Sequence, residues 1–77
     1  MSWYLEGFSK QDEFIVLNQK LTGTKDAEVA RLLSVVKDRD LRIGGYPVEG
    51  ERLGAFARLA GHEVRDDLDY FVNFKID

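Results

Sequence analysis

Residues 68–76 read Leu-Asp-Tyr-Phe-Val-Asn-Phe-Lys-Ile, a stretch in which every second residue is apolar or aromatic. Successive side chains of a strand point to opposite faces of its sheet. One face would carry Tyr70, Val72, Phe74 and Ile76, and the other Phe71, Asn73 and Lys75. The alternation predicts a β-strand with one face on the core.

Two more strands are predicted near the N-terminus, at residues 2–8 and 13–21, joined by a polar turn at 9–12. In the first, Trp3 and Leu5 share one face. The second contains the continuous apolar run 14–17. Coverage of both faces of this run would suit a central strand, which is the commoner case, or a strand that pairs across a subunit boundary.

A first helix is predicted from Thr24, whose hydroxyl could cap the helix start, while Asp26 and Glu28 suit the positive end of the helix dipole. The helical spacing of the apolar residues defines one buried stripe, formed by Val29, Leu32, Leu33 and Val36. Charged residues 37–40 end the pattern.

A second helix should follow an irregular link at residues 41–47, with Pro47 just before the helix or in its first turn. Its buried positions would be Leu53, Phe56, Ala57 and Ala60. Gly61 is placed to end it in the left-handed conformation. Gly50 and Gly54 weaken the helix and could let another backbone approach closely.

The predicted order is therefore strand, strand, helix, helix, strand. This is a small single α+β domain, residues 1–77, in which a three-stranded antiparallel sheet packs against two helices and the last strand joins the N-terminal hairpin. A chain of 77 residues can build only one hydrophobic core.

Composition narrows the class of protein. The chain has no cysteine, so disulfides and thiolate chemistry are excluded. It shows neither a signal peptide nor an apolar run long enough to cross a membrane, which favours a cytoplasmic protein. Its net charge of -3 argues against direct binding to nucleic acid.

Candidate catalytic or metal-binding residues are few. His62 is the only histidine, and Glu63 and Asp66 are the nearest carboxylates in sequence that could orient it. The alternative is that His62 caps the second helix or lies on the surface. Glu63, Asp66, Asp67 and Asp69 lack the spacing of a calcium loop. We therefore expect a protein without enzymatic activity, cofactor or metal.

Residues 61–77 contain five acidic and two basic residues and so carry the whole net charge of -3. If this segment forms an acidic surface, it would steer a basic protein partner toward it. The alternative is that it forms a solvated turn without a binding role. A sheet of only three strands should also leave some aromatic residues exposed as binding anchors. The candidate partner-binding residues are Glu63, Asp66, Asp67, Asp69, Tyr70 and Phe71.

Three segments, WYLEGFSK at 3–10, GYPV at 45–48 and DLDYF at 67–71, resemble a group of small bacterial proteins that look like immunity proteins of polymorphic or contact-dependent growth inhibition systems. The resemblance implies a cytoplasmic protein that binds the toxin domain of its own system, often a nuclease, and occludes its active site. It carries over no catalytic residues. The alternative is a general interaction module or a self-associating regulatory domain, as monomer or homodimer.

Overall fold

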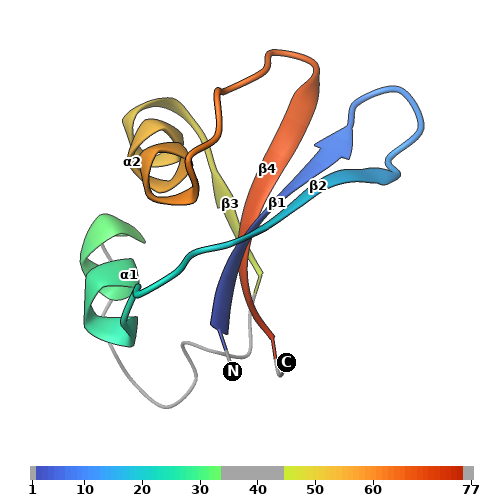
Figure 1. The fold of residues 1–77 in the computed structure, drawn as a ribbon. Coiled ribbons are helices and arrows are strands. Elements are labelled where there is room, and N and C mark those ends of the chain that lie inside the picture. Colours follow the sequence, from blue (N-terminus) through green and yellow to red (C-terminus); the bar gives the residue numbers. More distant parts are fainter. Residues whose placement is uncertain (1, 34–44, 76–77) are drawn as a thin grey trace.

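A single antiparallel sheet forms one layer of the molecule, and two helices cover one of its faces (Figure 1). The computed structural model describes residues 2–33 and 45–75. The strand order is β2-β1-β4-β3. The elements are β1 (Ser2–Ser9), β2 (Ile15–Lys20), α1 (Asp26–Leu33), β3 (Tyr46–Val48), α2 (Gly50–Ala60) and β4 (Leu68–Lys75).

The two central strands are β1 and β4, which pair along their whole lengths. Leu5 lies opposite Val72, and Trp3 lies opposite Phe74. Because residues directly opposite each other share a face, these four apolar side chains all point toward the helices. The predicted alternation of both strands and the return of the last strand to the N-terminal hairpin are confirmed, except that Ile76 lies outside the described residues.

The helices contribute the second half of the core. Buried positions are Val29, Ala30 and Leu33 in α1, and Leu53, Phe56 and Ala57 in α2. Leu32 and Ala60 are partly buried against the same cluster. The predicted stripes are therefore confirmed, except that Val36 lies outside the described residues.

The sheet has a fourth strand that the sequence did not predict. Tyr46–Val48 pairs antiparallel with β4, so the expected three-stranded sheet is wrong. The irregular link expected at 41–47 is a strand from Tyr46 onward, and its residues 41–44 lie outside the described residues. Pro47 lies in this strand and not in the first turn of α2. Proline has no N–H to donate, and it is tolerated because β3 is an edge strand.

The apolar run 14–17 was expected in a central strand, and that expectation is wrong. β2 is one of the two edge strands of the sheet, since β4 occupies the other side of β1. Phe14, Ile15 and Val16 are all exposed, and only Leu17 packs partly against the core. This hairpin extends away from the helices in Figure 1.

The ends of the helices agree only partly with the predicted caps. The Thr24 hydroxyl is buried and has no hydrogen-bond partner in the described part of the chain, so it does not cap α1. Gly61 does end α2 with φ 65°, as predicted. An added Cβ at Gly54 would meet no described atom within 4 Å, so no backbone approaches closely there.

Candidate interaction site

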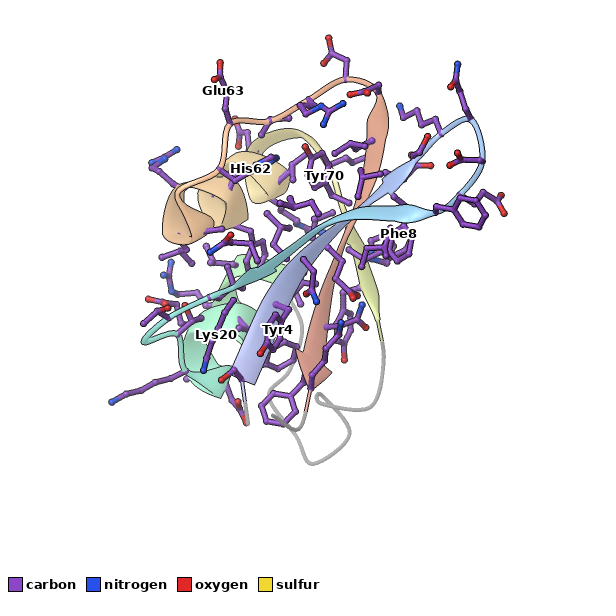
Figure 2. The ribbon with its side chains drawn as sticks, turned by 45° about the vertical axis from the view of Figure 1, so that its right-hand side comes forward. Tyr4, Phe8, Lys20, His62, Glu63 and Tyr70 are labelled. Carbon is purple, nitrogen blue, oxygen red and sulfur yellow. The ribbon has the colours of Figure 1, made fainter. Side chains whose placement is uncertain are left out.

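The loop between α2 and β4, residues 61–67, is held in place by Tyr70. The Tyr70 hydroxyl accepts a hydrogen bond of 2.9 Å from the backbone N–H of Arg65. It also lies 2.8 Å from Nε2 of His62, and Figure 2 shows these two side chains facing each other between α2 and the sheet. The loop is therefore tied to the core at two points.

His62 closes the C-terminal end of α2 through its backbone. Its N–H donates to the carbonyl of Ala57 at 2.9 Å, which satisfies one of the carbonyls that every helix end leaves without a partner. The imidazole lies within hydrogen-bond distance of the Tyr70 hydroxyl, and its ring packs at a tilt against the Tyr70 ring. Glu63 points away into solvent (Figure 2), so this carboxylate does not orient the imidazole.

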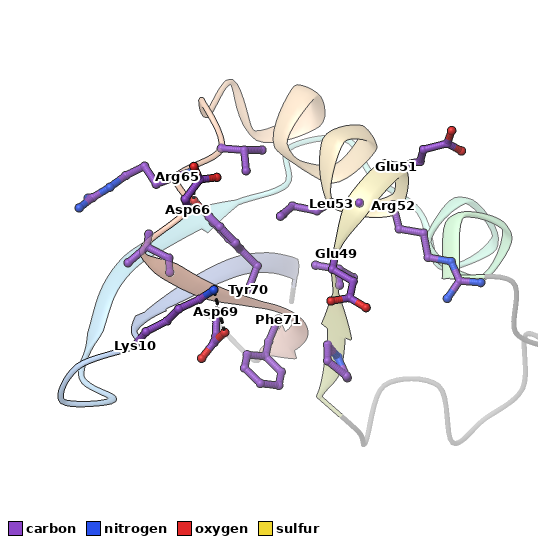
Figure 3. Close-up of a pocket in the computed structure, with 15 residues that line it drawn as sticks. Lys10, Glu49, Glu51, Arg52, Leu53, Arg65, Asp66, Asp69, Tyr70 and Phe71 are labelled. Carbon is purple, nitrogen blue, oxygen red and sulfur yellow. Dashed lines mark hydrogen bonds and ion pairs between the residues drawn. The ribbon is translucent and has the colours of Figure 1, made fainter.

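The same loop forms one wall of a surface hollow with a volume of about 920 Å³. The opposite wall is the junction of β3 and α2 (Figure 3). Buried apolar residues form the floor: Val48, Leu53, Leu68 and Tyr70. The charged side chains that line it are Lys10, Glu49, Glu51, Arg52, Arg65, Asp66 and Asp69.

Two of the predicted acidic residues are already paired with bases. Arg65 donates to both carboxylate oxygens of Asp67, at 3.0 and 2.6 Å. The hydrogen bond from Arg65 holds the pKa of Asp67 below its usual value. Nζ of Lys10 lies 4.0 Å from Oδ1 of Asp69, the contact drawn as a dashed line in Figure 3. These carboxylates are partly neutralised before any partner arrives.

Other carboxylates that line the hollow form no ion pair within the described residues. Glu49, Glu51 and Asp66 are exposed, and within residues 2–33 and 45–75 none of them has an ion-pair partner. Glu63 is likewise exposed and unpaired in that part of the chain. The unpaired groups are therefore mainly negative, and they suit a basic surface on a partner.

The six predicted contact residues do not form one patch. Tyr70 is only 3% exposed: it anchors the loop from below and lies in the floor of the hollow, not on the open surface. Asp66, Asp69 and Phe71 line the hollow. Glu63 and Asp67 are exposed and do not line it. Phe71 belongs to the sheet face opposite Tyr70, because successive residues of β4 alternate.

Aromatic residues do lie on the sheet face that the helices leave uncovered, as expected from their number. Phe8 and Phe71 meet edge to face there, with ring centroids 5.7 Å apart. Tyr4 lies on the same face, under the ammonium of Lys75 at 5.4 Å. All three rings are half-buried, so this face is only partly available to a partner.

Sequence reasoning missed Glu49, Glu51 and Arg52, which complete the opposite wall of the hollow. These residues are separated from residues 63–71 by most of α2, and the pairing of β3 with β4, which positions the start of α2, brings them together. The charged run Glu-Gly-Glu-Arg at 49–52 was the one available signal.

Comparison with known proteins identifies the family. A family described as a domain of unknown function, DUF7683, matches residues 2–73, and the chain belongs to it. No curated protein and no solved structure matches the chain. In the described residues, no three or more His, Cys, Asp or Glu side chains group as metal ligands, and no helix has the length and apolarity needed to cross a membrane.

Proposed function

We propose that this protein binds a cognate toxin domain in the bacterial cytoplasm and neutralises it by covering its active site. The observation that carries the proposal is the hollow beside the α2–β4 loop, where Glu49, Glu51 and Asp66 are exposed without ion-pair partners in the described chain. The resemblance of segments 3–10, 45–48 and 67–71 to immunity proteins supports the same class.

The physical basis is complementarity between this acidic rim and a basic cleft. A nuclease binds phosphates with Lys and Arg, so its active site carries the opposite charge to these carboxylates. Charge complementarity raises the rate of encounter and excludes partners of like charge. Val64, exposed beside the carboxylates, adds an apolar contact within the same rim.

Steric occlusion requires no reacting group on the inhibitor. It requires a surface that keeps its shape when the partner arrives, since ordering mobile side chains or loops on binding costs affinity. The two contacts of Tyr70 to the α2–β4 loop supply this rigidity on one wall of the hollow. The N-terminal turn of α2 supplies the other wall.

Co-expression with the C-terminal domain encoded by the adjacent gene tests the proposal. Growth rescue and a co-purifying one-to-one complex are the expected results. Glu49→Lys combined with Asp66→Lys should weaken the complex at least about tenfold and reduce its salt dependence. Glu28→Lys, on α1 and outside this hollow, is the matched control and should retain rescue.

Two outcomes would contradict the proposal. Toxicity of the neighbouring domain without rescue by the wild-type protein would remove the toxin-neutralising function. Rescue that the double charge reversal leaves intact, with unchanged affinity in low and high salt, would leave immunity standing but show that the hollow is not the contact surface.

A further inference from the structure

The outer edge of β2 is unusually exposed for a strand. Five of its six residues are exposed, and only Leu17 is partly buried. The exposed fractions of Phe14, Ile15 and Val16 are 72%, 46% and 55%. An apolar run of this kind on an edge strand is a predicted site of pairing with another chain.

The other edge of the sheet is protected against such pairing. β3 has only three residues, and one of them is Pro47, which cannot donate a hydrogen bond. β2 is twice as long and has no proline. The N–H of Leu21 donates to the carbonyl of Trp3, so the alternation of an antiparallel ladder directs the backbone groups of Asn18 and Lys20 outward.

We propose that β2 pairs antiparallel with β2 of a second copy of this chain, which joins the two sheets into one continuous sheet. The charge distribution along the strand favours this occupant. Asp12 and Glu13 precede β2, whereas Lys20 ends it and Lys25 follows. Antiparallel pairing about a two-fold axis brings the acidic end of each strand to the basic end of the other.

Lys10, in the turn between β1 and β2, does not place a positive charge at the acidic end of the strand, because its ammonium lies toward Asp69 on β4. Pairing would also cover the apolar run, since Ile15 and Val16 would contact the neighbouring strand. The surface involved is separate from the hollow, which lies mainly between β3, α2 and the α2–β4 loop. Self-association is therefore independent of the proposed toxin binding.

One strand edge buries less than the roughly 800 Å² per partner of a standard stable interface. The dimer should accordingly dissociate on dilution. Analytical ultracentrifugation of the full chain, from about 1 µM to several hundred µM, should show a monomer that converts to a dimer. The amides of Asn18 and Lys20 should exchange hydrogen more slowly as the concentration rises.

Val16→Lys should shift the midpoint of dimerisation at least about tenfold to higher concentration, because it places a charge on the paired edge. Val64→Lys is the matched control, since Val64 is also exposed but lies in the α2–β4 loop. Circular dichroism checks that both variants fold. The Asn18→Cys variant, in a chain with no other cysteine, should form a disulfide-linked dimer under oxidation.

The proposal is overturned if the wild-type chain stays monomeric throughout this range, or if the dimer of Val16→Lys is as stable as that of the wild type. Protection of the Asn18 and Lys20 amides only on addition of a toxin domain would assign the edge to that partner instead. The exchange measurement needs no variant, so it remains decisive if a substitution impairs folding.

Discussion

The indole Nε1 of Trp3 donates a hydrogen bond of 2.9 Å to Oδ1 of Asp26, which connects the first strand to the first turn of α1. Trp3 is almost fully buried, so its N–H depends on this carboxylate. Asp26→Ala should lower the free energy of unfolding by about 1–3 kcal/mol, the cost of a buried polar group left without a partner. Urea denaturation measures the change.

Glu28 provides the control for this prediction, because it lies in the same acidic first turn. Glu28→Ala removes a favourable charge at the helix N-terminus and should cost only a few tenths of a kcal/mol. Equal losses for the two substitutions would mean that the helix dipole, and not the bond to Trp3, explains the role of Asp26.

The hydroxyl of Tyr70 positions one wall of the candidate site. Tyr70→Phe should lower the free energy of unfolding by about 1–2 kcal/mol, since the Arg65 N–H loses its acceptor. Hydrogen exchange at Arg65 should become faster. His62→Ala leaves the Arg65 bond in place and should leave that exchange rate close to the wild-type value. A Tyr70→Phe variant with unaltered exchange at Arg65 would show that the loop is held by other contacts.

Lys75 neutralises a carboxylate on the uncovered face of the sheet. Glu6 is 5% exposed, and its Oε2 lies 2.5 Å from Nζ of Lys75, while Asn73 donates to Oε1. Lys75→Met should lower the free energy of unfolding by about 1–3 kcal/mol, less than for a fully buried pair because Lys75 is partly exposed.

A double-mutant cycle separates the pair from its surroundings. Glu6→Gln added to Lys75→Met removes the unpaired charge and should recover part of the lost stability. Simple additivity of the two single substitutions would show that the carboxylate and the ammonium are not coupled.

Gly54 lies inside α2 without a packing reason to be glycine. An added Cβ meets no described atom within 4 Å, so Gly54→Ala should raise the free energy of unfolding by about 1 kcal/mol. Gly61 also has open space, but its φ of 65° penalises any side chain, and Gly61→Ala should destabilise. Thermal denaturation of both variants gives the signs. Destabilisation by Gly54→Ala would show that Gly54 has a structural role of its own.

The ion pair of Asp67 predicts a small dependence of stability on pH. Arg65 lowers the folded-state pKa of Asp67 below the usual 3.8, so folding is favoured when the carboxylate is ionised. This contribution is present above the unfolded-state pKa and is lost as the pH falls through the lower folded-state value. NMR titration of the Asp67 carboxyl should show its pKa rising toward 3.8 in Arg65→Gln. An unchanged titration would assign the shift to another group.

Local patterning was sufficient for most of the fold. The alternation of residues 68–76 and the helical spacing around Val29 and Phe56 identify core faces, because each pattern depends on a few neighbouring residues. The same reasoning failed for Phe14 and Pro47. An apolar run is compatible with a central or an outer strand, and the short strand that contains Pro47 forms only because β4 offers it an edge to pair with.

The candidate site shows the same division. The acidic composition of residues 61–77 was visible in the sequence. It did not reveal that Asp67 and Asp69 are paired, that Tyr70 is buried, or that Glu49 and Glu51 line the same hollow as Asp66. Ion pairing between separate segments depends on the distances between charged groups in the fold, and the number of charges in a segment does not give these distances.

The sequence by itself determined a cysteine-free α+β chain, the core-facing sides of its main strands and helices, and the glycine that ends α2. Only the tertiary structure decided that β2 is an exposed edge, that β3 completes the sheet, and which carboxylates line one hollow. The physical reason is that side-chain periodicity is set by backbone geometry within a few residues. Strand order and surface charge, by contrast, arise from contacts between segments that are distant along the chain.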